Sequence, residues 1–189
     1  KKNHGTKEVD VIIATPPCQG MSVANHKKNN ESERNSLVIE SVNLVSKIKP
    51  KVFLFENVRA FLSTECTDLD GQNKTIREAI ELNLGGRYNI HFQVINFKDY
   101  GNPSSRTRTL VIGVRKDIQE ITPLDLFPQQ EKSVVIKQVI GDLQPLVSMG
   151  EISKQDIYHS FRPYDKRMIP WVENIKEGQS AFDNEDPAR

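Results

Sequence analysis

Two residues that could do chemistry follow two short apolar runs early in the sequence. Cys18 comes four residues after the run Val9 to Ala14, within Pro16-Pro17-Cys18-Gln19, and Glu56 follows directly after the run Lys51 to Phe55. Ligands collect beyond the carboxyl ends of strands in an open parallel sheet, so a thiol and a carboxyl at neighbouring strand ends could face one small molecule. The spacing therefore predicts a nucleophile and an acid in a single site.

Each of these residues also has an ordinary structural explanation. A lone cysteine after a strand is usually a small buried hydrophobic residue, and an isolated glutamate at a strand end is usually solvated or a cap. The two prolines before Cys18 favour the catalytic interpretation, because they rigidify the turn and remove backbone donors there. Cys66 has no such setting, so we expect it to be a buried, unreactive thiol.

Arg106 and Arg108 could bring positive charge to this pair. Alternate side chains of an extended segment point the same way, so both guanidinium groups could reach one face. Nearby positive charge would help Cys18 to ionise, since a free thiol has a pKa of about 8.5 and is mostly protonated at neutral pH. A salt-bridged surface is the alternative explanation for the two arginines.

The apolar pattern predicts an α/β architecture that would position these residues. A helix at about 35–48, stopped by Pro50, lies between the strands Val9 to Ala14 and Lys51 to Phe55, so the three form a parallel crossover unit. A second helix is expected at Thr75 to Leu84, with Gly85-Gly86 supplying a left-handed cap. The prediction of the first helix is based on apolar residues at helical spacing: Leu37, Val38, Leu44, Val45 and Ile48.

Two further strands, Tyr88 to Val94 and Thr109 to Val114, are predicted to form a hairpin at the far side of the sheet. Val134 to Leu143 is a candidate short helix. The polar stretch Gly20 to Arg34 is longer than most connections in a compact domain, which favours an active-site lid.

The composition is typical of a globular protein and excludes several classes. Hydrophobic residues make up 37% and charged residues 27% of the 189 residues, and the net charge of +1 does not by itself indicate a nucleic-acid binder. The two cysteines form no CxxC pair, so no spacing supports a metal site or a disulfide framework. No apolar run reaches the roughly 20 residues of a membrane span, so we expect a cytoplasmic protein, nucleoid-associated if its source is prokaryotic.

Three sequence blocks resemble the signature blocks of a known enzyme family. PPCQGMS at Pro16 to Ser22, FENV at Phe55 to Val58 and YGNPSSRTRTLVIG at Tyr100 to Gly113 have the order and intervals found in the DNA cytosine carbon-5 methyltransferases. Two further segments, Ser133 to Leu143 and Ile175 to Phe182, resemble less closely the stretch that precedes the target-recognition domain in that family. The resemblance implies the Rossmann-like α/β fold of S-adenosylmethionine-dependent methyltransferases.

The resemblance also implies a covalent route for methyl transfer from S-adenosylmethionine to carbon 5 of cytosine in DNA. Cys18 would add as a thiolate to carbon 6 and convert the ring into an enamine, and Glu56 would protonate nitrogen 3. Arg108 would contact the base carbonyl, and Arg106 would position the thiol or a phosphate. The target base must leave the duplex stack, which suits the predicted lid.

Supporting roles fall to neighbours of this pair. Pro16 and Pro17 are expected to contact the cofactor, and Asn57 is expected to orient the backbone around them. Gln19 and Ser22 support the nucleophile as members of its block. No residue is expected to bind a metal.

The sequence lacks the main cofactor cradle. Its ten glycines include one adjacent pair and no GxG, so the loop that binds S-adenosylmethionine lies outside these residues. We therefore expect residues 1–145 to be the C-terminal half of an incomplete catalytic domain that lacks the N-terminal cofactor-binding strands. Residues 146–189 would be a linker or the start of the target-recognition region, and the isolated chain would be inactive.

Several alternatives remain open at this stage. The enzyme could serve a restriction–modification system or an epigenetic-type modification, with double-stranded DNA as its partner. The shared cysteine and glutamate would equally suit a tRNA cytosine-5 methyltransferase. The chain could also be a split or inactive subunit that binds nucleic acid, completed by a complementary subunit or by further segments of the same polypeptide.

Overall fold

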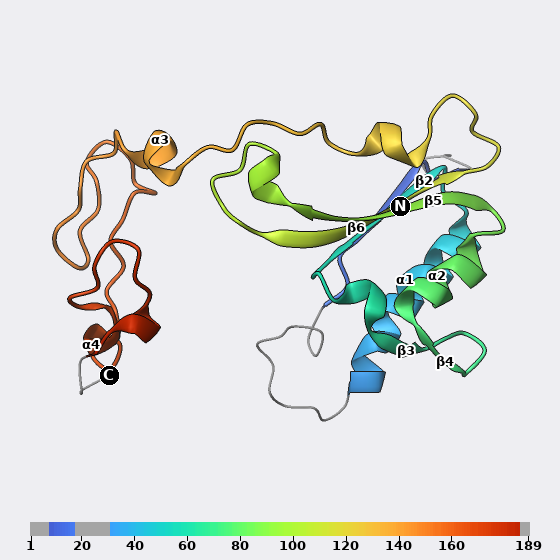
Figure 1. Cartoon of the computed structure of the whole chain (residues 1–189), viewed down its shortest axis with the longest axis horizontal. Helices are drawn as coiled ribbons and strands as arrows, with labels where there is room; N and C mark the ends of the chain where they lie inside the picture. Colours follow the sequence, from blue (N-terminus) through green and yellow to red (C-terminus); the bar gives the residue numbers. More distant parts are fainter. Residues whose placement is uncertain (1–7, 18–30, 186–189) are drawn as a thin grey trace, which may run out of the picture. The chain divides into compact units, whose positions relative to one another are not determined.

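The computed structural model describes residues 8–17 and 31–185, and the chain divides into two compact units (Figure 1). The first unit is Lys1–Val139 and the second is Ile140–Arg189. Only the first unit contains a sheet of more than two strands among the described residues.

A four-stranded mixed sheet forms the centre of the first unit. Its strands are β1 (Val11–Ala14), β2 (Val52–Asn57), β5 (Tyr88–Asn96) and β6 (Thr107–Arg115), in the spatial order β1-β2-β6-β5. β1 and β2 are parallel and α1 (Glu31–Ile48) lies between them in the chain, whereas β6 is antiparallel to both β2 and β5. The predicted crossover unit and the hairpin at the far side of the sheet are therefore confirmed.

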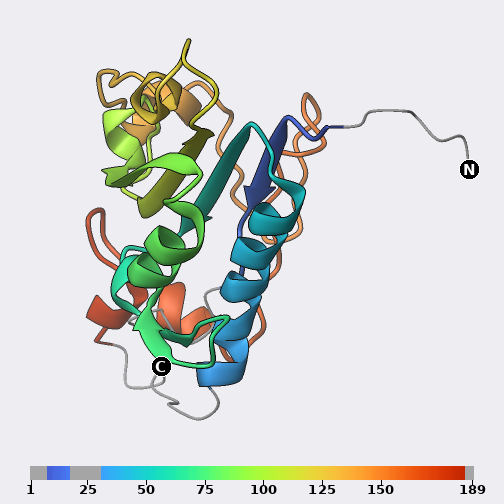
Figure 2. The same ribbon diagram turned by 90° about the vertical axis from the view of Figure 1, so that its right-hand side faces the viewer.

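Two helices cover one face of this sheet and enclose the core. α1 and α2 (Ile76–Leu84) lie side by side, as Figure 2 shows. Fully buried side chains from both helices and from β2 meet between these layers: Val38, Val42, Val45, Phe53, Phe55, Ile76 and Ile80. Each contributes about 2 kcal/mol by leaving water. A Cβ atom on Gly113, which pairs with Phe53, would overlap the Phe53 ring, so glycine allows that close packing.

The predicted left-handed cap at the end of α2 is wrong. Gly85 has φ −62° and ψ −24°, which is right-handed helical backbone. Lys116 Nζ lies 2.8 Å from Gly85 O and 3.3 Å from Gly86 O. Lys116 therefore binds the backbone carbonyls of Gly85 and Gly86 directly after α2, where Gly85 keeps a helical conformation.

β2 extends further than its apolar run predicted. Glu56 and Asn57 pair with Leu110 and Thr109 of β6, so Glu56 lies within the strand rather than after it. β6 supplies backbone partners beyond the last apolar residue of β2, and those hydrogen bonds continue the strand.

The helix boundaries also differ from prediction. α1 begins at Glu31, so the last residues of the predicted lid belong to a helix, and the remainder of that lid, 20–30, lies outside the described residues. The candidate helix at Val134 to Leu143 is reduced to α3 (Ile136–Ile140). Leu37, Leu44 and Ile48, which belong to the predicted apolar stripe of α1, are 40–48% exposed, because only the other flank faces the sheet.

The sequence pattern did not predict a small hairpin that packs against the helices. It consists of β3 (Glu65–Thr67) and β4 (Asn73–Thr75). Asp68 at its turn is 6% exposed and accepts hydrogen bonds from Lys74 Nζ at 2.8 Å and Asn83 Nδ2 at 2.7 Å. Short 3-10 helices complete the first unit at η1 (Phe61–Ser63), η2 (Phe97–Asp99) and η3 (Pro123–Leu126).

The second unit has little regular structure. It contains α4 (Ile169–Val172) and η4 (Ala181–Asp183). Asn184 is 8% exposed, and its Nδ2 donates to Pro170 O at 2.9 Å and to Glu173 O at 2.7 Å, which ties the end of this unit to α4. Its assignment to a target-recognition region stays a prediction. Across the described part of both units, no helix has the length and apolar character that a membrane crossing needs.

Candidate active site

Three strand ends meet at one edge of the sheet. β1 and β2 run parallel, so their carboxyl ends lie together, and β6 runs antiparallel to β2, so its amino end joins them. This edge carries Pro16 after β1, Glu56 near the end of β2 and Arg108 near the start of β6. Topology therefore gathers residues that are far apart in the sequence.

Glu56 and Arg108 form an ion pair across β2 and β6. Arg108 Nε lies 2.9 Å from Glu56 Oε1, and the two side chains are 17% exposed for Arg108 and 27% for Glu56. Arg108 Nη1 also donates to Thr107 O at 2.8 Å, which restricts the guanidinium further. The carboxylate is thus held in place while part of it still faces solvent.

Asn57 ties the end of β2 to the segment that leads to Cys18. Its Nδ2 donates to Pro16 O at 2.9 Å, and its Oδ1 accepts from Val58 N–H at 2.8 Å. The residue is only 3% exposed. The expected contact between Asn57 and the Pro16 backbone is present, and both polar ends of the amide serve to position main chain.

The remaining predicted site residues are less well tested. Cys18, Gln19 and Ser22 lie outside the described residues, so the pairing of the thiol with Glu56 stays a prediction. Arg106 is exposed, and its backbone is fixed by hydrogen bonds of 3.0 Å to Ser104 O and from Phe97 N–H. The structure brings Arg108, but not Arg106, to the carboxylate.

Sequence reasoning missed two polar residues that hold this edge together. Thr109 is fully buried, and its hydroxyl lies 3.1 Å from Val58 O and 3.3 Å from Arg59 O, so it fastens the chain after β2 to β6. Asn96 Nδ2 donates to Ser105 Oγ at 3.1 Å across the loop before β6. In the sequence, a hydroxyl residue at the start of the apolar run TLVIGV could have indicated the structural role of Thr109. No sequence pattern pointed to Asn96.

An open hollow of about 430 Å³ lies beside this edge, between the end of β1 and α1. Its walls are Ala14, Thr15, Pro16, Pro17, Leu37, Glu40, Ser41 and Leu44. The predicted cofactor-contacting prolines therefore border a mainly apolar concavity.

Comparison with known proteins identifies the family. The family described as C-5 cytosine-specific DNA methylase matches residues 1–185. The chain belongs to this family. The resemblance carried by the three sequence blocks is thereby confirmed.

The relatives of this chain include proteins named as type II methyltransferases. The type II methyltransferase M1.HgaI of Avibacterium volantium is 33% identical over 183 residues, which are 95% of this chain and 49% of that enzyme. M.XorII of Xanthomonas oryzae pv. oryzae is 31% identical over 154 residues, 80% of this chain and 34% of its own length.

A solved structure supports the same fold. An E. coli prophage protein, described as a DNA modification methyltransferase, has a TM-score of 0.57 and 29% identity, with 77% of this chain and 38% of that one covered. The chain spans about half or less of the length of these relatives. Its fold is a partial Rossmann-like methyltransferase fold, as the sequence predicted.

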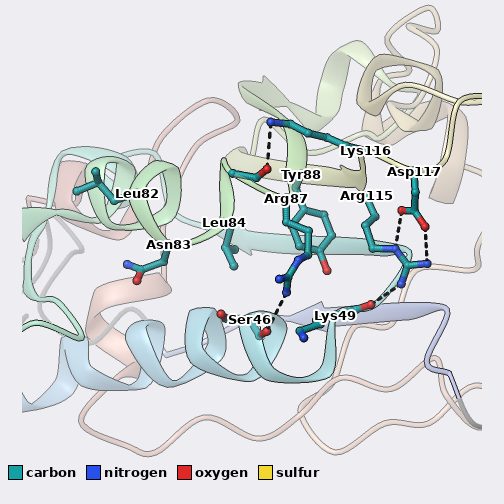
Figure 3. A pocket seen from close by; sticks show the side chains of 11 residues that line it. Ser46, Lys49, Leu82, Asn83, Leu84, Arg87, Tyr88, Arg115, Lys116 and Asp117 are labelled. Carbon is teal, nitrogen blue, oxygen red and sulfur yellow. Dashed lines mark hydrogen bonds and ion pairs between the residues drawn. The ribbon is translucent and has the colours of Figure 1, made fainter.

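A larger hollow, of about 650 Å³, lies at the other end of the sheet from the methylase signature residues (Figure 3). It adjoins the C-terminal ends of α1 and α2. Arg115 Nη1 donates to Lys49 O at 2.7 Å, and Arg87 Nη1 lies 3.5 Å from Ser46 O. Arg115 and Arg87 thus bind backbone carbonyls at the end of α1, and Lys116 binds those at the end of α2. Binding to the helix ends explains why basic side chains line this hollow.

Cys66 is a structural thiol in this methylase-family chain. It is 3% exposed, and burial raises its pKa to about 11. At pH 8 alkylation of Cys66 in the folded protein is therefore expected to be at least about 100-fold slower than that of a free cysteine. Because burial raises the pKa of this thiol in the folded state, Cys66 also makes the fold less stable as pH rises above the pKa of a free thiol towards about 11.

Mass-spectrometric mapping of iodoacetamide labelling measures the reactivity of Cys66. The urea-unfolded protein provides the reference rate. Equal labelling of Cys66 in the folded and unfolded proteins would contradict the burial described above.

Proposed function

We propose that this chain carries the methyl-acceptor half-site of a DNA cytosine carbon-5 methyltransferase, in which the target base lies between Cys18 and Glu56. The observation that supports this most directly is the meeting of Glu56, Arg108 and the Asn57-bound Pro16 at one strand edge. Cys18 follows Pro16 by two peptide units, a span of at most about 7.6 Å. The thiol is thus within reach of the edge that holds the carboxylate.

In this proposal Cys18 starts the reaction by bonding to the base. Its thiolate adds to carbon 6, and the electron pair of the C5–C6 double bond becomes available at carbon 5. S-adenosylmethionine, when bound, supplies the methyl group as an electrophilic sulfonium methyl. After carbon 5 is methylated, its proton passes to water, nitrogen 3 returns its proton to Glu56, the C6–S bond breaks, and the double bond and the thiolate are restored.

Glu56 neutralises the negative charge that the addition of the thiolate places on the ring. A carboxylic acid beside nitrogen 3 can donate a proton to it and accept a hydrogen bond from the exocyclic amine. The ion pair with Arg108 uses Oε1, so Oε2 is the oxygen that we assign to the base. Arg108 would hold this carboxyl and reach the base carbonyl, and the exposed position of Arg106 favours a phosphate contact.

The residues present could form only one wall of a site for S-adenosylmethionine. Pro16, Pro17, Leu37 and Leu44 border an apolar hollow that could receive part of S-adenosylmethionine. The sequence has ten glycines but no GxG, so the cradle for the rest of the cofactor must come from polypeptide outside these residues.

Methyl-group tracing tests this function. The complete enzyme, given S-adenosylmethionine labelled in its methyl group, should label carbon 5 of cytosine in double-stranded DNA roughly 100-fold faster than in tRNA. Mass spectrometry of the released nucleosides gives both rates. Faster labelling of tRNA would reassign the substrate to RNA, and no labelling by a protein that binds both cofactor and DNA would indicate a binding subunit.

A further inference from the structure

The loop 97–106 joins β5 to β6 and ends at Arg106, directly before β6. The two ends of this loop are tied together, because Phe97 N–H donates to Arg106 O at 3.0 Å. Asn96 caps η2 at the start of the loop, and its Oδ1 accepts from Lys98 N–H at 3.2 Å. The backbone position of Arg106 therefore depends on the position of η2.

A later segment of the same unit, residues 131–133, binds η2 through two hydrogen bonds. Glu131 N–H donates to Asp99 O, and Ser133 Oγ donates to Lys98 O, both at 2.9 Å. In Figure 1 this part of the chain runs past the tip of the β5–β6 hairpin on its way to α3. The name strap is used below for residues 131–133.

The strap also lies in direct contact with the loop beyond η2. Tyr100 and Glu131 form a parallel β-bridge. The next loop residue, Gly101, has a φ of +75°, a backbone conformation that favours glycine. The lack of a side chain there leaves room for the Glu131 carboxyl group, because a Cβ atom on Gly101 would lie 2.6 Å from Glu131 Oε2. The strap and the loop are thus packed together.

Arg106 depends on these contacts more than Arg108 does. Arg108 is held by its ion pair with Glu56 and by its pairing with Ile95 of β5. Arg106 lies just outside the strand, its side chain is exposed, and it forms no ion pair with the residues that the structure describes. Its guanidinium can therefore meet an external anion, and η2 and the strap set the backbone from which it extends.

We propose that the strap is a positioning element that holds Arg106 toward a phosphate of the bound DNA. Glu131 and Ser133 are its positioning residues, and they act through η2. This inference rests on the proposed function, because the phosphate contact of Arg106 is part of it. The Glu56–Arg108 ion pair is held separately by β2 and β6, so the strap governs DNA binding rather than the chemical step.

The salt dependence of DNA binding by the complete enzyme tests this positioning. Arg106→Gln should weaken binding about tenfold and lower the slope of log affinity against log salt by about one, as expected for one phosphate contact. The strap variant, Glu131→Pro with Ser133→Ala, removes both hydrogen-bond donors to η2. It should weaken binding at least about threefold and lower the slope in the same direction. Loss of the Glu131 carboxylate would by itself strengthen binding to DNA, so the charge change does not explain a weaker affinity.

A double-mutant cycle shows whether the strap acts through Arg106. If it does, adding the two strap changes to Arg106→Gln should weaken DNA binding by less than about a further twofold. Losses that multiply in full would overturn the proposal, as would a strap variant with the wild-type salt slope. A wild-type slope in Arg106→Gln itself would overturn both the phosphate contact and its positioning.

Steady-state kinetics distinguishes positioning from general damage to the fold. The strap variant should raise KM for DNA at least about threefold and leave kcat within about twofold of the wild type, because the Glu56–Arg108 pair does not depend on the strap. Ser133→Thr keeps the hydroxyl group and should leave both constants unchanged. A fall in kcat without a rise in KM would overturn the proposed role in DNA binding.

Amide hydrogen exchange measures the contact directly and needs only the mild change Ser133→Ala. The Phe97 amide, which donates to Arg106 O, should exchange about three- to tenfold faster in this variant. Ser63→Ala is the matched control, because Ser63 is also exposed and its Oγ donates to Ala60 O at 3.0 Å. The control should leave Phe97 exchange and DNA binding unchanged. Wild-type exchange of Phe97 in Ser133→Ala would overturn the proposal.

DNA binding is measured without methyl transfer, so the two proposals can fail separately. A wild-type enzyme that binds cofactor and DNA, and in which the strap and Arg106 are coupled, could still transfer no methyl group. That result would refute the proposed function and leave the positioning in place. Methyl transfer to cytosine with no coupling between the strap and Arg106 would do the reverse.

Discussion

Replacing Cys18 with serine in the complete enzyme is expected to abolish the covalent adduct with DNA that contains 5-fluorocytosine. Fluorine at carbon 5 cannot leave as a proton does, so a thiol that has added to carbon 6 stays bound to the base. A serine hydroxyl is a much weaker nucleophile than a thiolate at neutral pH, so methyl transfer should fall at least about 1000-fold.

Denaturing electrophoresis of the enzyme with labelled DNA measures this adduct. Cys66→Ala is the matched control, because it removes the other cysteine, which is 3% exposed and lies in β3, away from the catalytic edge. The Cys66→Ala protein should form the adduct like the wild type. An adduct that persists in Cys18→Ser would remove Cys18 from the mechanism.

Glu56→Gln is expected to slow methyl transfer by about 100- to 1000-fold, the usual contribution of a general acid. Glutamine keeps the volume of glutamate but cannot donate a carboxyl proton to nitrogen 3. The affinity for DNA should change less than about threefold, since phosphate contacts supply most of the binding.

Single-turnover methylation and fluorescence anisotropy measure the two quantities separately. Glu120→Gln, at an exposed position, makes the same charge change away from the site and should leave both unchanged. Glu56→Gln also removes the ion pair with Arg108, so its thermal unfolding is compared with that of the wild type. Parallel losses in binding and rate would make Glu56 a binding residue instead of an acid.

Arg108 links this prediction to the geometry of the sheet. Its guanidinium contacts Glu56 because β6 runs antiparallel beside β2, which puts the start of one strand next to the end of the other. Thr109 reinforces that arrangement through its hydroxyl contacts to Val58 O and Arg59 O. The position of the proposed acid therefore depends on strand pairing as much as on its own residue type.

The sequence by itself determined the residue types and the local elements. The prolines before Cys18, the glutamate after an apolar run and the paired arginines are contiguous patterns, so their resemblance to the methylase blocks needed no structure. The crossover of β1, α1 and β2 was also predictable, because hydrophobic periodicity and a helix-stopping proline are local signals.

Only the tertiary structure decided which residues meet. Arg108 rather than Arg106 pairs with Glu56, Lys116 binds the backbone carbonyl of Gly85 at the end of α2, and one flank of α1 stays exposed while the other is buried. Each outcome depends on a neighbour that is remote in the sequence, and strand register and the choice of packing partner are set by the free energy of the whole assembly. Periodicity within a segment describes which face is apolar, but it does not contain the identity of the surface that covers it.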